Sequence, residues 1–203
     1  KELSWSSYEV LIDHVPIETA RIVVDAGYEL VPANEELSGA QVELINVEGR
    51  ELRLRDALAS VRGEYDYILI DCPPALNLLT VNALVAADTV MIPVQCEYFA
   101  LEGLAALRNV IDKISQSPLN PKLKIEGLLR TMFDPRNNLD NEVSAELREH
   151  FGDKLYRTII PRNVRLAEAP SYGKTVISYD MQSKGAQAYL ALAGEILRRD
   201  EAA

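Results

Sequence analysis

Asp71 stands out for its chemistry, because its carboxylate follows the apolar residues 67–70 and is followed, after Cys72, by two prolines. A carboxylate at the end of a buried strand can hold a metal-bound water beside the phosphates of a nucleotide. The prolines remove two backbone donors and stiffen the turn, which fixes the direction of the carboxylate. Capping of the following helix is an equally strong interpretation of Asp71 taken alone.

Three more loops place polar residues or prolines directly after apolar runs. These loops are residues 93–97, 131–136 and 161–165. The last two carry Arg136, Arg162 and Arg165, whose planar guanidinium groups suit the phosphate oxygens of a nucleotide or a nucleic acid. A single surface arginine is more often simply solvated, so each of these residues carries little weight alone.

Several common catalytic and binding motifs do not occur in the sequence. Gly173-Lys174-Thr175 supplies the end of the phosphate-binding motif G-x-x-x-x-G-K-[ST], but Glu168 stands in place of its first glycine. The segment also precedes an expected strand, whereas a phosphate-binding loop follows a strand and opens a helix. The motifs G-x-G-x-x-G and G-x-S-x-G are missing as well, which leaves little support for a dinucleotide dehydrogenase or a Ser-His-Asp hydrolase.

Short apolar runs rich in β-branched residues alternate with amphipathic segments along the chain. Continuous apolar runs are typical of strands that are covered on both faces. We expect strands at residues 67–70, 89–94, 125–132, 156–160 and 175–179, with a weaker candidate at 28–31. We expect helices at residues 37–47, 52–61, 76–87, 101–114, 143–151 and 186–197.

This alternation predicts an α/β fold with a doubly wound, mostly parallel sheet and helices on both faces. No internal repeat or long linker interrupts residues 1–203, so we expect a single domain. In such sheets ligands bind outside the carboxyl ends of the strands. The loops singled out above are therefore predicted to gather at one edge of the sheet.

The composition of the 203 residues, with 48% hydrophobic and 26% charged residues, argues against disorder. No apolar run approaches the ~20 residues of a membrane span, and no secretory leader is visible. Cys72 and Cys96 lack the spacing of a zinc site or a disulfide framework, so a cytoplasmic location is expected. The net charge is −10, yet residues 154–174 carry five basic residues and one acid. This basic strip is either a phosphate-facing site or a solvated cationic surface.

Taken together, the segments resemble the ParA/Soj family of partitioning ATPases, within the MinD-like group of P-loop proteins with a deviant phosphate-binding loop. The matching text includes YDYILIDCPP, IPVQCEYFALEGL, IEGLLRTMFDPRNNL, IIPRNVRLAEAPSYGK and SKGAQAYLALAGEIL, in order and with compatible spacing. The family's K-G-G-V-G-K-T-T loop and its D-x-D-P-Q segment are not present. We therefore expect the chain to be the C-terminal three-quarters of a ParA-like ATPase domain, inactive by itself, with an N-terminal portion in the natural protein.

The resemblance implies roles for individual residues. Asp71 corresponds to the Walker B aspartate that orders Mg²⁺ through water. The segments that surround the adenine of ATP correspond to Met132, Asp134, Pro161 and Asn163. Arg136 and Arg165 correspond to arginines associated with non-specific DNA binding, and Gln95 and Glu97 lie in a segment next to the switch and the dimer interface.

The resemblance also implies a cycle in which ATP and Mg²⁺ produce a DNA-binding homodimer that a ParB-like centromere-binding partner stimulates to hydrolyse ATP. Such a protein is cytoplasmic, associates with the nucleoid and does not bind membranes. Two alternatives stay open. One is a non-catalytic adaptor or DNA-binding protein derived from ParA. The other is a MinD-like membrane-associated ATPase, which the polar C-terminal sequence RRDEAA does not favour.

Overall fold

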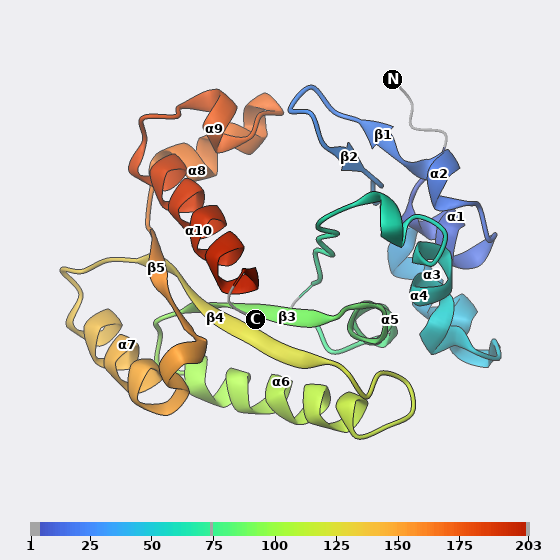
Figure 1. Cartoon of the computed structure of the whole chain (residues 1–203), viewed down its shortest axis with the longest axis horizontal. Coiled ribbons are helices and arrows are strands. Elements are labelled where there is room, and N and C mark those ends of the chain that lie inside the picture. Colours follow the sequence, from blue (N-terminus) through green and yellow to red (C-terminus); the bar gives the residue numbers. More distant parts are fainter. Residues whose placement is uncertain (1–4, 74, 202–203) are drawn as a thin grey trace. The chain divides into compact units, whose positions relative to one another are not determined.

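The computed structural model describes residues 5–73 and 75–201 of the chain (Figure 1). Its contacts divide the chain into two compact units, which are described separately. The N-terminal unit comprises Lys1–Asp88 and Asn109–Lys124, and the C-terminal unit comprises Thr89–Arg108 and Ile125–Ala203. Within the described residues, no helix combines the length and apolar character that crossing a membrane requires.

The N-terminal unit is built mainly from short helices. They are α1 (Ser7–Ile12), α2 (Ile17–Ala20), α3 (Leu37–Glu43), α4 (Arg53–Leu58) and α5 (Leu78–Ala86). The two-residue strands β1 (Ile22–Val23) and β2 (Glu29–Leu30) form an antiparallel hairpin. The hairpin confirms the weak strand candidate at residues 28–31, and Gly27, with a φ of 85°, supplies the left-handed backbone that its turn requires.

Local capping and one buried amide explain how this unit holds together. Ser6 and Glu9 form a reciprocal capping box at the start of α1. Asn82 on α5 is 1% exposed, and its side chain donates to the Arg50 carbonyl (2.8 Å) and accepts from the Leu54 amide (3.2 Å). Because a buried amide must be hydrogen-bonded, Asn82 fixes α5 against the start of α4.

Residues 67–70 do not form the strand that the sequence predicts. Residues 67–73 have no regular secondary structure, and Leu69 is 91% exposed although Val61, a few residues earlier, is buried. The physical reason is that a strand needs a neighbour for its amides and carbonyls, and no described strand pairs with this segment. Apolar sequence alone does not make a strand.

The C-terminal unit contains a three-stranded sheet in the order β3 (Thr89–Gln95), β4 (Lys124–Phe133) and β5 (Leu155–Pro161). Strands β4 and β5 run parallel. Glu126 on β4 ties the three strands together, because it accepts hydrogen bonds from Thr89 Oγ1 on β3 (2.9 Å) and from the hydroxyl of Tyr156 on β5. The helices of this unit are α7 (Asn138–Phe151), α8 (Val164–Glu168), α9 (Val176–Tyr179) and α10 (Lys184–Asp200), together with the first half of α6 (Ala100–Ser115).

Helices cover both faces of this sheet, as Figure 1 shows for α7 on one side and α10 on the other. Adjacent residues of β4 point to opposite faces. Leu129 packs in a buried cluster with Leu192 of α10, whereas Arg130 donates a hydrogen bond to Ser144 of α7. The predicted α/β architecture with helices on both faces of a parallel sheet is thus confirmed.

Residues 175–179 do not form the predicted strand, because Val176–Tyr179 form α9. Thr175 caps the helix, because its side chain accepts a hydrogen bond from the amide of Ser178 (3.2 Å). A local cap of this kind offers the backbone a partner where no neighbouring strand does.

Glu195 of α10 covers the outer side of β5. Its carboxylate is 8% exposed and accepts hydrogen bonds from the amides of Arg157 and Thr158, both at 2.8 Å, and from Arg199 at 3.0 Å. Burial alone would raise the pKa of Glu195, but the hydrogen bonds from Thr158 and Arg157 outweigh it and lower the pKa to about 2. The charged carboxylate therefore stabilises the folded state.

Replacing Glu195 with Gln should lower the free energy of unfolding by about 1–3 kcal/mol, because two strand amides lose a charged acceptor. Since the folded-state pKa lies below the ordinary value of 4.5, the contribution is fully present above pH 4.5 and is lost as the pH falls toward 2. Urea unfolding at several pH values, followed by circular dichroism, measures it. Glu149→Gln, an exposed change on α7, is the matched control; an equal effect of both changes would contradict the interpretation.

Candidate functional site

The carboxyl ends of β4 and β5 lie side by side. Phe133 and Pro161 are register partners, and the amide of Arg162 donates to the carbonyl of Phe133 at 3.1 Å. The loop after β4 and the loop after β5 are therefore neighbours. The structure thus brings together two of the loops singled out in the sequence. These loops carry the four residues predicted for the adenine side and the two arginines predicted to bind DNA. These six residues are Met132, Asp134, Pro161, Asn163, Arg136 and Arg165.

Met132 turns the end of β4. It has a φ of 51°, in the left-handed region that costs a non-glycine residue about 1 kcal/mol or more. A shift of the β4–β5 register between Arg130 and Phe133 spans this position. Strained backbone of this kind gathers at binding sites, and here it leaves the Met132 side chain 40% exposed at the carboxyl edge of the sheet.

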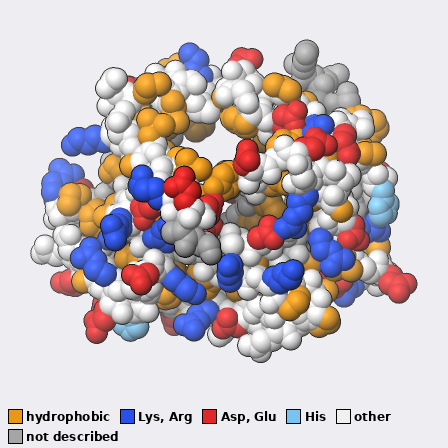
Figure 2. Space-filling view, viewed as in Figure 1, with side chains coloured by type: hydrophobic (Ala, Val, Ile, Leu, Met, Phe, Trp, Pro, Cys, Tyr) orange, Lys and Arg blue, Asp and Glu red, His pale blue; other side chains and the backbone are white. Residues whose placement is uncertain are grey.

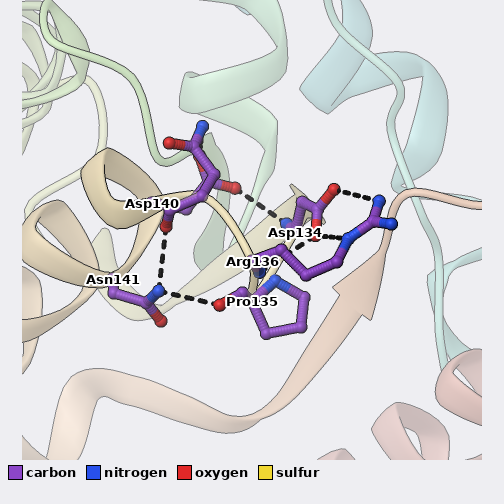
Figure 3. Close-up of polar contacts among 6 residues, drawn as sticks. Asp134, Pro135, Arg136, Asp140 and Asn141 are labelled. Carbon is purple, nitrogen blue, oxygen red and sulfur yellow. Dashed lines mark hydrogen bonds and ion pairs between the residues drawn. The ribbon is translucent and has the colours of Figure 1, made fainter.

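Asp134 and Arg136 form a two-pronged ion pair, drawn in Figure 3. Arg136 donates from Nε (2.9 Å) and Nη2 (2.7 Å) to the two carboxylate oxygens of Asp134, and its backbone amide adds a third bond at 3.0 Å. The Arg136 guanidinium, followed by that amide, lowers the pKa of Asp134 to about 2. The Arg136 side chain is nevertheless 88% exposed, so its outer surface faces solvent.

A group of polar side chains at the start of α7 holds this loop in place. Asp140 is 8% exposed and accepts from the amide of Asp134 (2.8 Å) and from Nδ2 of Asn137 (2.7 Å). Asn141 donates to the carbonyl of Pro135 at 2.9 Å (Figure 3). The sequence analysis missed Asp140, although the three-residue spacing from Asn137 is the spacing of a capping box and was the available signal.

Asn163 starts α8 and is held from behind by α10. Its Oδ1 accepts from the amide of Arg165 at 3.0 Å, which caps the helix. A Cβ placed on Gly185 of α10 would lie 2.6 Å from Cγ of Leu166 and 3.2 Å from Oδ1 of Asn163. Only glycine lets α10 approach the loop this closely. The Nδ2 group of Asn163 has no hydrogen-bond acceptor among the described residues and remains available as a donor.

Arg165 is paired with two carboxylates. Its Nη1 lies 2.7 Å from Oε2 of Glu168, and its Nε lies 3.3 Å from Oδ2 of Asp180. Glu168 also accepts from the hydroxyl of Tyr179, whose ring stacks on that of Tyr172 with centroids 5.0 Å apart. Hydrogen bonding to Glu168 raises the pKa of Arg165. Half of the Arg165 side chain remains exposed.

The other residues predicted for the site form no hydrogen bond or ion pair with this cluster among the described residues, or belong to the other unit. Gln95 ends β3, and its carbonyl accepts from the amide of Glu97 at 2.9 Å in a tight turn. Asp71 is exposed and belongs to the N-terminal unit, so the structure does not place it against the C-terminal loops. Of the two prolines after Cys72, the second, Pro74, lies outside the described residues. Among the described residues, no cluster of His, Cys, Asp and Glu has the arrangement of a metal site.

A parallel sheet with helices on both faces and polar loops at its carboxyl edge defines the class of doubly wound α/β proteins, which bind ligands at that edge. The comparisons with known proteins agree with this class. Residues 1–125 match the family model described as an AAA domain. A solved structure of cobyrinic acid a,c-diamide synthase from Mycobacterium smegmatis, with a bound ATP analog and magnesium, superposes with a TM-score of 0.82 at 34% identity, covering 98% of this chain and 74% of that one.

Sequence relatives narrow the class to one family. The chain is 53% identical over 199 residues to the chromosome partitioning protein ParA of Myxococcus xanthus, covering 98% of this chain and 70% of the relative. It is 50% identical over 190 residues to the sporulation initiation inhibitor protein Soj of Bacillus subtilis, covering 93% of this chain and 75% of the relative. The chain belongs to the ParA/Soj family of chromosome-partitioning ATPases, as its sequence motifs indicate.

Removing the Arg136 guanidinium by Arg136→Ala should raise the pKa of Asp134 from about 2 toward its ordinary value of 3.8. Because folding lowers the pKa of Asp134, the ion pair is fully present above pH 3.8 and is lost as the pH falls through about 2. Carboxyl ¹³C NMR titration measures the change. Arg162→Ala is the matched control and should give a smaller rise, since Arg162 acts on Asp134 only through its charge. The same Asp134 pKa in the wild-type protein, Arg136→Ala and Arg162→Ala would refute the pairing of Asp134 with Arg136.

Proposed function

We propose that this protein is a DNA-partitioning ATPase that binds ATP and Mg²⁺ as a homodimer, binds DNA without sequence preference and is stimulated by a ParB-like partner. We further propose that the two units belong to one ATPase domain and that the protein works in the cytoplasm at the nucleoid. The observation that carries the proposal is the pairing of the β4 and β5 ends, which sets the loops with Asp134 and Asn163 beside each other.

The adenine side of the proposed site consists of Met132, Asp134, Pro161 and Asn163. The free Nδ2 donor of Asn163 suits a ring nitrogen of adenine, and the exposed thioether of Met132 suits the face of the base. The cap on α8 and the contact with Gly185 orient Asn163 before any ligand arrives. Support comes from the Mycobacterium smegmatis structure with an ATP analog and magnesium, which shares this fold at 34% identity.

Asp71 is the proposed ligand of a magnesium-bound water. Its carboxylate is exposed and has no hydrogen-bond or ion-pair partner among the described residues, so it is free to accept from such a water. When bound, Mg²⁺ offsets the negative charge of the nucleotide phosphates. For this role residues 67–70 must be brought to the nucleotide, and pairing with a neighbouring strand would do so while burying their exposed apolar side chains.

Arg136 and Arg165 are the proposed contacts to DNA phosphates. They follow adjacent strands, and both guanidinium groups reach solvent. Arginine contacts to phosphate bind without reading base sequence. Gln95 and Glu97 are the proposed dimer and switch residues. The exposed aromatic pair that follows them, Tyr98 and Phe99, is in edge-to-face contact at 5.0 Å and offers apolar area to a second subunit.

Reversing the charge of Arg165 by Arg165→Glu should weaken DNA binding at least about tenfold and equally for unrelated duplexes. The slope of log Kd against the logarithm of the salt concentration should decrease by about one or more, because a phosphate contact is lost. Fluorescence anisotropy with two unrelated duplexes at several salt concentrations tests this. Lys122→Glu, an exposed change in the N-terminal unit, controls for net charge. A loss of affinity that differs between the two duplexes would refute the assignment of Arg165 as a phosphate contact.

Replacing Asp71 with Ala should lower the rate of Mg²⁺-dependent ATP hydrolysis by at least about 100-fold in the protein as its gene encodes it. A coupled phosphate-release assay with and without Mg²⁺ measures this. Asp66→Ala removes another exposed carboxylate from the same segment and should leave the rate within about twofold. Equal rates for the Asp71 and Asp66 variants would exclude Asp71 from magnesium binding.

A further inference from the structure

A cavity lies away from the carboxyl edge of the sheet. It runs along β5 between the end of α7 and the second half of α10, and it has a volume of about 1050 Å³. We call it the arginine groove, because it is lined by Arg130, Arg148, Arg157, Arg198 and Arg199. It shares no residue with the loops after β4 and β5 or with the proposed DNA contacts.

Arg130 lines the groove from β4 and is 2% exposed. Its Nη1 donates to Ser144 Oγ (2.9 Å) and its Nη2 to the carbonyl of Tyr156 (2.8 Å), but its Nε has no acceptor among the described residues. None of its described partners is a carboxylate. Burial and the nearby charge of Arg148 lower the pKa of Arg130. The Glu195 carboxylate acts on Arg130 only through its charge, without a hydrogen bond. A buried guanidinium without a directly paired carboxylate is costly, so an anion beside it would stabilise the fold.

The other arginines of the groove are also poorly compensated. Arg148, Arg157 and Arg198 form no ion pair with a described carboxylate, whereas Arg199 pairs with Glu195 and lies 4.0 Å from the centroid of the Tyr156 ring. Five arginines face two acids, Glu195 and Asp153, in the lining. The excess of three positive charges contrasts with the net charge of −10 of the whole chain. Figure 2 shows several Lys and Arg side chains over β5 and α7 on the face drawn.

Glu195 offsets one of the five arginine charges and pairs with Arg199, and its oxygens also accept from the amides of Arg157 and Thr158. It therefore offers no free acceptor to the other guanidinium groups. The groove therefore offers guanidinium groups from four separate elements, β4, α7, β5 and α10, to one concave space. Guanidinium groups that converge in this way suit the several oxygens of a phosphate ligand. The volume is that of a small-molecule site, and part of the wall, at Leu190 and Ala191, is apolar.

We propose that the arginine groove is a binding site for a small, multiply charged anion of the phosphate class, separate from the ATP site and from the DNA-binding arginines. The ligand oxygens accept from the guanidinium groups of Arg148, Arg157 and Arg198. Its charge compensates Arg130 behind them. The polyphosphate alone and a polyphosphate carried by a nucleotide share this chemistry, and the apolar wall would contact only the latter.

Isothermal titration of the full chain with tripolyphosphate, at constant ionic strength, tests the site. Tripolyphosphate should bind with a Kd in the micromolar range, and Arg157→Gln and Arg198→Gln should each weaken it by at least about tenfold. Arg165→Gln, at the carboxyl edge, and Lys122→Gln are the matched controls and should change the Kd less than about twofold. Loss of binding in Arg165→Gln with no change in the groove variants would overturn the proposal, as would the same modest loss in all four.

Thermal unfolding supplies a second readout for the buried arginine. Tripolyphosphate should raise the Tm of the wild-type protein and of the control variants, and should raise that of Arg157→Gln by a smaller amount at the same ligand concentration, because stabilisation follows occupancy of the groove. Arg130→Met should reduce the rise in the same way. If Arg130→Met does not fold, the variants Arg157→Gln and Arg198→Gln still decide the question, since both residues lie at the surface of the groove.

Competition identifies the source of the phosphate and separates this site from the proposed function. Competition between ATP and tripolyphosphate for the groove is measured in the Asp71→Ala variant. If ATP displaces tripolyphosphate and Arg157→Gln removes this displacement, the groove takes a nucleotide. If ATP displaces none, the groove takes the polyphosphate alone. Displacement by a short DNA duplex that depends on Arg157 and Arg198 would mean that the groove is part of the DNA surface, and it would overturn the proposal. Failure of the DNA prediction for Arg165 leaves these outcomes unaffected.

Discussion

The parallel pairing of β4 with β5 is the constraint on which the candidate site depends. The bond from the Arg162 amide to the Phe133 carbonyl closes this pairing at the carboxyl edge. Two loops that are almost thirty residues apart in sequence thereby share one edge, and each is then fixed by its own cap, Asn137 before α7 and Asn163 before α8. The helices that cover the two faces of the sheet keep water from competing for these strand hydrogen bonds.

The electrostatics of the C-terminal unit divide into compensated and uncompensated arginines. At the carboxyl edge, Arg136 is paired with Asp134, and Arg165 is paired with Glu168 and Asp180. The phosphate binding proposed for these two arginines would compete with carboxylates that already hold the guanidinium groups, which would lower the affinity for phosphate and favour release. Along β5, Arg130, Arg148, Arg157 and Arg198 have no carboxylate partner among the described residues, whereas Arg199 pairs with Glu195. Arginine side chains are therefore paired with carboxylates at the carboxyl edge of the sheet, whereas most of those along β5 are not.

Sequence patterns predicted elements whose partners lie within this chain. The apolar runs at residues 89–94, 125–132 and 156–160 became paired strands, and the amphipathic spacing of residues 101–114 became α6. Residues 67–70 have the same composition but find no described strand to pair with, and residues 175–179 yield to the cap at Thr175. The periodicity of apolar residues does not show which strands pair. It also does not show the hydrogen bond that Asp140 accepts from the Asp134 amide, because that bond forms only when α7 folds back beside β4. The roles of Asp71, Gln95 and Glu97 rest on family resemblance.

The absence of a side chain at Gly185 has a mechanical consequence. Because the backbone of α10 sits directly against Leu166 and the carboxamide of Asn163, the first turn of α10 and the α8 loop have no space to slide past each other. Any displacement of the C-terminal helix must carry the Asn163 carboxamide with it, and any displacement of that carboxamide must carry the helix. This close approach thus acts as a rigid coupling between the last helix of the unit and the carboxyl edge of its sheet.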